Sequence, residues 1–589
     1  MKSLSTTLAV SLLLAGCGEK QTEVVNDSSK TASKSIDTKA VAKPKANSLL
    51  PDIGLEGSEL QPFAYVKIIA LPKLLQKAMT VAQAVKPDPQ VAMLPMMAGM
   101  ALGDPSLASI DADAPIGLFV FDEFGGDDVT FTLAMKLTEE SPIRKQAETL
   151  KLALIERDGW TLATKAPELF DQVKDWSPML DFVEQAPEGD LEVGVRLSPL
   201  WDEMPKLEGA IEGGLLASPF EDDTKESLKK LSGVMLEEIA TLDSAKINLF
   251  LSSEEVAVKS TMRAKDGSAL SQQFQSKAKT GNPQVANFVP SGGFFDVVMD
   301  YDTSTFPAYV NHLVEKIAPI FEGEFKQILL RYQAMAADLP DFFGGQAAAR
   351  YDVGFESSNM DFVQVGTTKV SPEEFGKMFE EYLKLNQELF DKIDFFQEMG
   401  IKYEFDLNQT KPVEGIPTFR ISMKMDMQEV DEAIFPAGLP YSNMSYLYAV
   451  MDGHYAMAMD EKQLGELIKR IREGKEIEDS LAENLPIQSG QSLRWSMDMV
   501  KYASLILGAS EIPLASPAIE EKLSKMELAP VSGSMSVGDG RVSADVRIPL
   551  KTIKAGVDYF ENEVDRLEKI PPEAVPALPE IEEETEREN

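Results

Sequence analysis

The sequence contains very little cysteine and histidine. Among its 589 residues there are one Cys and two His. A disulfide framework needs paired cysteines, and the common zinc sites need several Cys or His ligands. The composition therefore argues against both, and against a catalytic pair of Cys and His. We expect neither a metal nor a cofactor.

Basic residues are also scarce. The chain has 57 Lys and Arg against 96 Asp and Glu, which gives a formal net charge of −39. A surface of this sign repels the phosphates of nucleic acid and anionic lipid, so we expect no nucleic-acid partner and no membrane binding through charge. With 44% hydrophobic and 26% charged residues the composition is that of a folded protein. The length is sufficient for several domains.

The first residues have the pattern of an export signal. One lysine precedes an apolar stretch, Leu4 to Leu14, which is too short to span a bilayer. It ends in Leu14-Ala15-Gly16-Cys17, which matches the lipobox in full. The sequence thus resembles bacterial lipoproteins. This resemblance implies cleavage before Cys17 and acylation of that cysteine (with palmitate and related chains), and Gly18 rather than Asp after it implies the outer membrane.

Two terminal segments lack the composition of a core. Residues 17–60 contain no aromatic side chain and are rich in Ser, Thr, Lys, Asp and Ala, which predicts a flexible tether behind the lipidated cysteine. Residues 571–589 are rich in Pro and Glu and are predicted to form an acidic disordered tail. Counting 1–16 as the signal peptide, the folded body occupies residues 61–570.

Landmarks in the body recur in the same order. Asp-Gly lies between apolar runs in Leu152–Trp160 and again in Leu447–Tyr455, and this pair is the strongest short signal of a hairpin turn. Each hairpin is followed by an amphipathic helix, at Pro167–Lys174 and at Glu461–Arg472. The recurrence predicts an internal duplication.

Ser-Pro supports the same pairing. Ser141-Pro142 and Ser371-Pro372 each read as a helix N-cap followed by the first helical position. The second copy is longer between its landmarks. We assign the excess to a longer helix reaching Phe396 and to a strand pair at Ile401–Leu407 and Thr418–Met427, an insertion within the region from Phe375 to Met444.

A strand that leads directly into a helix is predicted four times, beginning at Phe63, Leu191, Phe294 and Leu493. In the fourth, Trp495 and Met497 alternate with polar residues, which is typical of an antiparallel strand with one covered face. We therefore predict an α+β fold of two tandem related lobes, 61–288 and 289–570, with helices packed on one face of largely antiparallel sheets. In element order the body resembles large, uncharacterised bacterial envelope proteins with internal duplications.

The catalytic candidates each have a simpler interpretation. His312 borders the apolar stripe of a helix, and His454 follows a turn. Ser534-Met-Ser536-Val-Gly538 lacks the first glycine of a nucleophile elbow and is expected in a hairpin. Asp111 and Asp113, like Asp300 and Asp302, do not continue into a calcium loop and read as solvated acids at loops or strand ends. We predict that the protein is not an enzyme.

Methionine is the remaining anomaly. Met93, Met96, Met97 and Met100 crowd into one apolar segment, and Pro95 and Gly99 discourage a continuous rigid helix there. Methionine side chains adapt to irregular apolar partners. The segment is either a loop tucked against the core or a lip over an apolar pocket, in which case these four residues bind the ligand.

Three functions are compatible with these observations. The first is a non-enzymatic envelope lipoprotein, anchored through its lipid with the body in the periplasm, that binds an apolar ligand such as a lipid. The second is a structural scaffold that presents its acidic surface to an envelope protein partner. The third is an unrecognised hydrolase. The first two are preferred.

Overall fold

The computed structural model describes residues 49, 62–121, 130–198, 201, 204–216, 222–275, 283–353, 360–391, 402–426, 443–451, 453–502 and 528–558. Cys17, most of the predicted tether and the acidic tail lie outside these residues. Of the predicted insertion, the helix beyond Asp391 also lies outside them.

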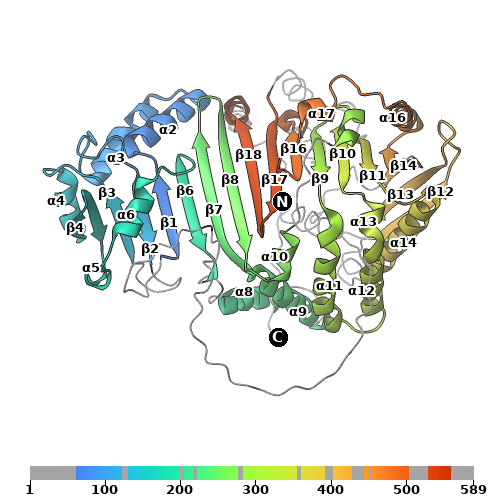
Figure 1. Ribbon diagram of the computed structural model, residues 1–589, viewed down its shortest axis with the longest axis horizontal. Coiled ribbons are helices and arrows are strands. Elements are labelled where there is room, and N and C mark those ends of the chain that lie inside the picture. The colour runs from blue at the N-terminus through green and yellow to red at the C-terminus, as the bar shows by residue number, and fades with distance from the viewer. Residues whose placement is uncertain are drawn as a thin grey trace, which may run out of the picture.

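The fold is α+β and is built on one 18-stranded antiparallel sheet (Figure 1). The strands are β1 (Ala64–Ile68), β2 (Ile116–Val120), β3 (Phe131–Met135), β4 (Ala153–Arg157), β5 (Trp160–Thr164), β6 (Leu191–Arg196), β7 (Leu242–Leu251), β8 (Glu255–Ala264), β9 (Phe295–Asp300), β10 (Gln346–Val353), β11 (Met360–Thr367), β12 (Lys402–Gln409), β13 (Thr418–Asp426), β14 (Asn443–Met451), β15 (His454–Ala458), β16 (Leu493–Met497), β17 (Val531–Gly538) and β18 (Arg541–Pro549).

Helices connect these strands. They are α2 (Leu71–Val85), α3 (Leu94–Leu102), α4 (Pro142–Thr149), α5 (Glu168–Gln172), α6 (Ser177–Glu184), α8 (Met204–Leu216), α9 (Asp222–Ile239), α10 (Ala269–Gln273), α11 (Phe306–Ile317), α12 (Gly323–Met335), α13 (Leu339–Phe342), α14 (Pro372–Phe390), α16 (Glu461–Glu473) and α17 (Leu481–Asn484). Short 3₁₀ turns are η1 (Pro89–Met93), η2 (Gln284–Phe288), η3 (Thr303–Thr305), η4 (Ala318–Ile320) and η5 (Ala336–Asp338).

The pairings give one spatial order across the sheet. It runs β4-β5-β3-β2-β1-β6-β7-β8 and continues β18-β17-β16-β9-β10-β11-β15-β14-β13-β12. Read outward from the β8–β18 pair, the two parts have the same order of strands, and β12 and β13 extend the second part. This order is the one that an internal duplication predicts, and the two Asp-Gly hairpins occupy corresponding places in it.

The two parts share a single sheet. β8 pairs with β18 from Glu255↔Pro549 to Arg263↔Arg541, so the sheet continues without a break between them. The predicted boundary after residue 288 also differs from the packing: Val285, Ala286 and Phe288 are buried in the core cluster of the second part. On this packing η2 belongs to the second part. Two tandem lobes related by duplication stay a prediction, which superposition of the parts would test.

Helices cover both faces of the sheet at its two ends. On β14, Leu447 and Ala449 lie in the cluster formed with α16 and α17, whereas Tyr448 and Val450 lie in the cluster formed with α14. At the other end α5 and α6 cover one face, and α2, α3 and α4 cover the opposite one. The prediction of helices on one face only was therefore wrong. The cause is visible in β14, whose run of apolar residues offers both faces for burial.

The local predictions from turns and caps were correct where the structure describes them. Asp158 and Gly159 both have positive φ, 50° and 78°, as the hairpin turn requires. Ser141 caps α4, and Ser371 forms a capping box with Glu374 at the start of α14. Of the second Asp-Gly pair, Gly453 has φ 77°, and Asp452 lies outside the described residues.

Candidate functional site

The middle of the sheet has an apolar face that no helix among the described residues buries fully. We call it the central face, and it belongs to β1, β6, β7, β8, β18, β17, β16 and β9. Directly paired residues share a face, so the registers define rows across these strands. One row is Ile68, Leu191, Leu249, Val258, Val546, Gly533, Trp495 and Val297. A second row is Val66, Val193, Ile247, Ser260, Ala544, Met535, Leu493 and Met299.

Side chains of the central face are mostly half-buried. Most members of the two rows retain part of their surface, and Ile247 is 46% exposed. Met262, on the same face beside Ile247, is 40% exposed. At strand spacing the eight strands measure about 34 Å from first to last. An exposed apolar surface of this extent is unusual for a protein that acts alone and marks a place where something apolar binds.

Polar residues occupy the opposite face of the same strands. The row behind the first apolar row is Lys67, Glu192, Asn248, Lys259 and Asp545. Charges of opposite sign follow one another along this row, which favours cross-strand pairing. Asn248 is almost completely buried, whereas the apolar side chains on the other face are not. The usual relation of polar outside and apolar inside is thus reversed in the middle of the sheet.

Tyr65, Lys67 and Glu192 form a buried polar group at the β1 end of this polar face. The Oη atom of Tyr65 donates a hydrogen bond to Glu192 Oε1 at 2.8 Å. Lys67 Nζ donates to the carbonyl oxygen of Phe182 at 3.2 Å and lies 4.0 Å from the centroid of that ring. Burial lowers the pKa of Lys67, and burial together with the charge of Glu192 raises the pKa of Tyr65. These contacts fasten α6 to β1 and β6.

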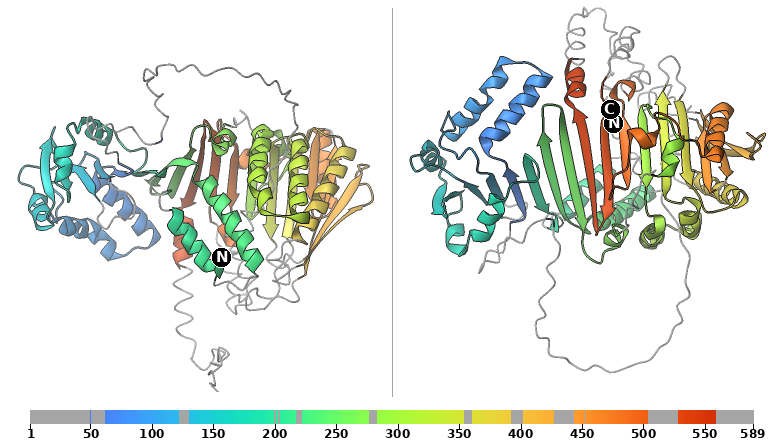
Figure 2. Two further views of the ribbon diagram at one scale, coloured as in Figure 1. Left: turned by 90° about the horizontal axis from the view of Figure 1, so that it is seen from below. Right: turned by 45° about the horizontal axis from the view of Figure 1, so that its top comes forward.

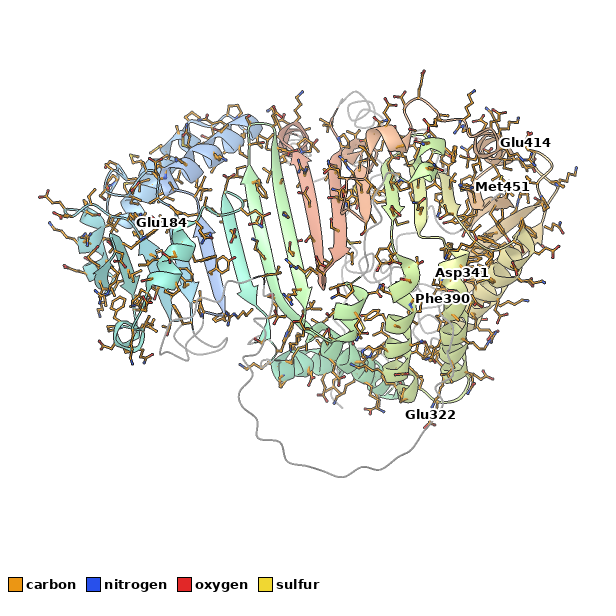
Figure 3. All side chains as sticks on the ribbon, in the orientation of Figure 1. Glu184, Glu322, Asp341, Phe390, Glu414 and Met451 are labelled. Atoms are coloured by element: carbon orange, nitrogen blue, oxygen red, sulfur yellow. The ribbon has the colours of Figure 1, made fainter. Side chains whose placement is uncertain are left out.

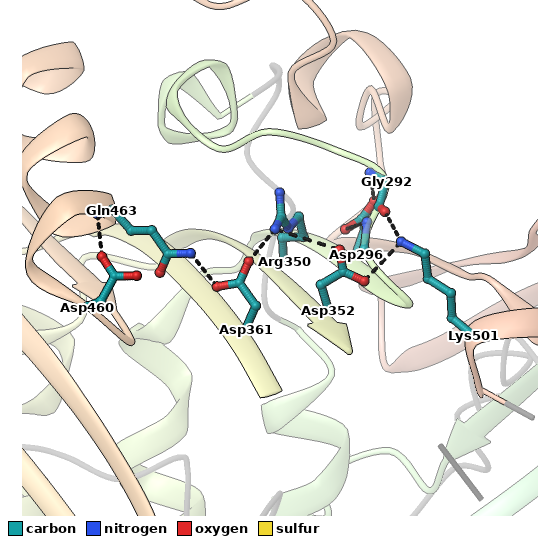
Figure 4. Close-up of polar contacts among 9 residues, drawn as sticks. Gly292, Asp296, Arg350, Asp352, Asp361, Asp460, Gln463 and Lys501 are labelled. Carbon is teal, nitrogen blue, oxygen red and sulfur yellow. Dashed lines mark hydrogen bonds and ion pairs between the residues drawn. The ribbon is translucent and has the colours of Figure 1, made fainter. Parts of the chain in front are cut away.

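A second polar cluster connects strands and helices of the second part (Figure 4). Arg350 donates to Asp361 at 2.5 Å, and Gln463 of α16 donates to the other oxygen of Asp361 at 2.6 Å. Lys501 Nζ lies 2.9 Å from Asp352 and donates to a backbone carbonyl at 2.7 Å. The cluster ties α16 and the helical turn at 499–502 to β10 and β11.

Asp296 belongs to the same cluster and is buried. It accepts hydrogen bonds from the backbone N–H groups of Gly292 and Gly293, at 2.8 and 3.1 Å. Burial nevertheless raises the pKa of this carboxyl group. In both polar clusters hydrogen bonds and ion pairs join helices to strands.

The α8–α9 hairpin stands beside the central face. In the view from below it projects from the sheet on the same side as α2 (Figure 2). Trp201 Nε1 donates to the carbonyl oxygen of Leu242 on β7 at 2.9 Å. On α9 the buried Glu238 lies 2.9 Å from His312 Nε2 and 3.5 Å from Lys316 Nζ, both on α11. The hairpin thus links the two parts of the sheet through its own ion pairs.

Three of the four methionines lie on a helix, and Met93, the last residue of η1, is the N-cap of that helix. Residues Leu94–Leu102 form α3, so the prediction that Pro95 and Gly99 discourage a continuous rigid helix was wrong for this stretch, whereas the residues up to Met93 form the 3₁₀ turn η1. Pro95 falls in the first turn, where no intrahelical N–H is lost, and Gly99 is buried where a Cβ would meet the backbone of Asp104 at 2.4 Å. Met93, Met96, Met97 and Met100 are 40% to 54% exposed. They are therefore not part of a filled core, and their role as ligand-binding residues stays a prediction.

The remaining candidates have structural partners. His454 begins β15 and stacks edge-on against Phe288, with ring centroids 6.2 Å apart. Ser534 and Ser536 lie within β17 of a hairpin, as predicted, and not at a strand-to-helix turn. The acidic residues of the two pairs have partners within the protein. Asp111 accepts from Asp113 N–H, Asp113 pairs with Lys73, Asp302 caps a 3₁₀ turn, and Asp300 is buried and accepts from Gln346.

Sequence reasoning missed the central face as a unit. Period two in β6 and β16 predicted an apolar face for each strand, but not that eight such strands align. Within the described residues, no helix has the length and hydropathy to cross a bilayer, and no cluster of three or more acidic, His or Cys side chains is placed to hold a metal. Figure 3 shows the side chains on both faces of the sheet. No family model, no curated protein and no solved structure matches this chain.

Proposed function

We propose that this chain is a non-enzymatic lipoprotein of the bacterial envelope that binds the acyl chains of lipids on its central face. The observation that carries the proposal is the set of half-exposed apolar side chains in paired rows across eight strands. Acyl chains need no directional partner, and burial of their surface is favourable by about 25 cal/mol per Å² before ordering costs. A face with Ser260 as a single polar side chain among its rows fits such a ligand.

The direct test uses a fluorescent fatty acid as the probe. We expect the purified full chain to bind it with saturation, to release it when unlabelled fatty acid is added, and to carry envelope lipids detectable by mass spectrometry when isolated gently from a bacterial host. Saturable binding without competition by unlabelled fatty acid would contradict the proposal. Absence of both probe binding and copurified lipid would also contradict it and would favour the scaffold, whose face is covered by an envelope protein.

The anchor is the second part of the proposal. Cleavage before Cys17 and acylation of its thiol and amine would attach the chain to the outer membrane, with its body in the periplasm. Two or three acyl chains make attachment effectively permanent, whereas one does not.

We expect Cys17→Ser to move the protein from the membrane fraction to the soluble fraction and to abolish lipidation. Intact-mass measurement of the mature chain checks this. A mature protein that still begins before Cys17 and carries no lipid mass would show that the lipobox is not used. Ser3→Ala is the control, since it changes the leader without touching the lipobox.

A further inference from the structure

The exposed methionines form one stripe that begins at Met93, the N-cap of α3, and continues along α3. Met93, Met96, Met97 and Met100 follow the spacing i, i+3, i+4 and i+7, which places them on one side of a helix. The opposite side holds the helix to the protein: Gly99 is buried and Leu102 packs against the cluster that contains Leu107 and Ile143. A helix that is apolar all round is normally buried. On α3, in contrast, the side that carries the methionines is not covered by any of the described residues.

The stripe is held rigidly. Asp104, directly after α3, accepts hydrogen bonds from the backbone N–H and the hydroxyl groups of Ser106 and Ser109, at 2.6 to 3.1 Å. These bonds hold the pKa of the Asp104 carboxyl group well below its usual range, so it stays charged at physiological pH. The backbone N–H of Asp104 donates a hydrogen bond to the carbonyl oxygen of Gly99 at 2.8 Å. The stripe is thus presented by fixed backbone.

Charge distinguishes this part of the surface from the rest of the chain. From Pro89 to Gly103 there is no charged residue. The preceding helix, α2, carries Lys73 and Lys77 and is followed by Lys86, and Asp88 is the one acid between Ala70 and Gly103. Lys73 and Lys77 pair with Asp113 and Asp190. In a protein of net charge −39, α2 and α3 therefore carry little of the negative charge that repels an anionic surface.

We propose that α2 and α3 dock on a lipid bilayer, with the four methionines entering the headgroup–acyl boundary. The inference rests on the proposed function, because a protein that binds acyl chains has to receive them from a membrane or deliver them to one. Flexible, polarizable methionine suits a fluid partner that has no fixed shape. The apolar side of α3 has lysines beside it on the neighbouring helix α2, and apolar side chains next to lysines are typical of segments that lie in a membrane interface. α2 and α3 lie along the upper edge of the first part of the sheet (Figure 1).

The test is vesicle flotation with the full chain carrying Cys17→Ser, which removes the predicted lipid anchor and leaves no cysteine. We expect binding to vesicles of phosphatidylethanolamine with phosphatidylglycerol. Replacing all four methionines by glutamine should weaken it by at least about tenfold, because four apolar side chains no longer enter the bilayer. Leu150→Gln is the matched control, as this leucine is also exposed but lies outside α3. Equal flotation of the methionine variant and the control would overturn the inference.

A second readout locates the contact. With Met97→Cys in the same background, an environment-sensitive dye at that position should shift to the blue on adding vesicles, whereas the dye at Leu150→Cys should not. No shift at Met97→Cys would overturn the inference even if the protein floats. Vesicle docking without fatty-acid binding would refute the proposed function alone, and fatty-acid binding without docking would refute the inference alone.

Discussion

Replacing Phe375 by alanine is expected to lower the local free energy of unfolding by about 3–5 kcal/mol. Phe375 is completely buried on α14. Its ring centroid lies 4.0 Å from that of Phe342, and 5.6 Å from those of Tyr448 and Tyr455. Truncation would remove the contacts of all three rings and leave a cavity between α14 and the sheet.

Hydrogen exchange of the α14 amides, followed by mass spectrometry, measures this loss region by region. Lys377→Ala on the exposed side of the same helix is the control, and its effect should stay within about 0.5 kcal/mol. A change for Phe375→Ala that does not exceed the control would show that this cluster does not hold α14 to the sheet. Protection lost in both parts of the protein at once would instead show that the sheet unfolds as one unit.

Local features could be read from the sequence because their causes are local. Asp158-Gly159 forms its hairpin because two successive residues adopt positive φ. Ser371 caps α14 because its hydroxyl reaches the N–H of Glu374. The alternation in β16 also places Trp495 on one face and Arg494 on the other, as the registers with β17 and β9 require. The predicted strand pair of the insertion corresponds to β12 and β13.

The joining of the two parts could not be read in this way. Nearly half of the chain separates β8 from β18, and neither strand has a sequence pattern that identifies the other as its partner. Their pairing is settled by complementary rows, such as Lys259 opposite Asp545 and Val258 opposite Val546. Such matches become visible only when both registers are known. The same holds for the central face, whose extent depends on the alignment of strands from both parts.

The prediction that Pro95 and Gly99 discourage a continuous helix in the methionine segment was wrong for a different reason. Pro95 and Gly99 are breakers on average, but the cost of proline vanishes in the first turn. At Gly99 the absence of a side chain allows the backbone after Asp104 to approach, which compensates for the lower helix propensity of glycine. The sequence showed that these residues were unusual. It did not show that tertiary contacts would make them favourable.

Introducing two carboxylates into the central face, through Ile247→Glu and Met262→Glu, is expected to weaken fatty-acid binding by at least about 100-fold. The two residues lie on the neighbouring strands β7 and β8 and point to the same face. An acyl chain lying across them would have to remove water from two ionised groups without supplying a hydrogen bond, and each such loss costs more than about 1.4 kcal/mol. The side chains of Ile247 and Met262 are 46% and 40% exposed, respectively, so the fold should tolerate the change.

The measurement is titration of the fluorescent fatty acid into the full-length double variant, with the thermal midpoint recorded in parallel. Leu150→Glu is the matched control: the leucine is 54% exposed and lies at the end of α4, away from the central face. We expect the control to bind the fatty acid as the native chain does, because Leu150 is not part of the continuous apolar surface of the central face. Native affinity in a folded double variant would mean that the ligand does not lie on the central face. Equal losses in the double variant and the control would mean that added negative charge alone repels the fatty-acid carboxylate, and the acyl-chain site would have to be abandoned.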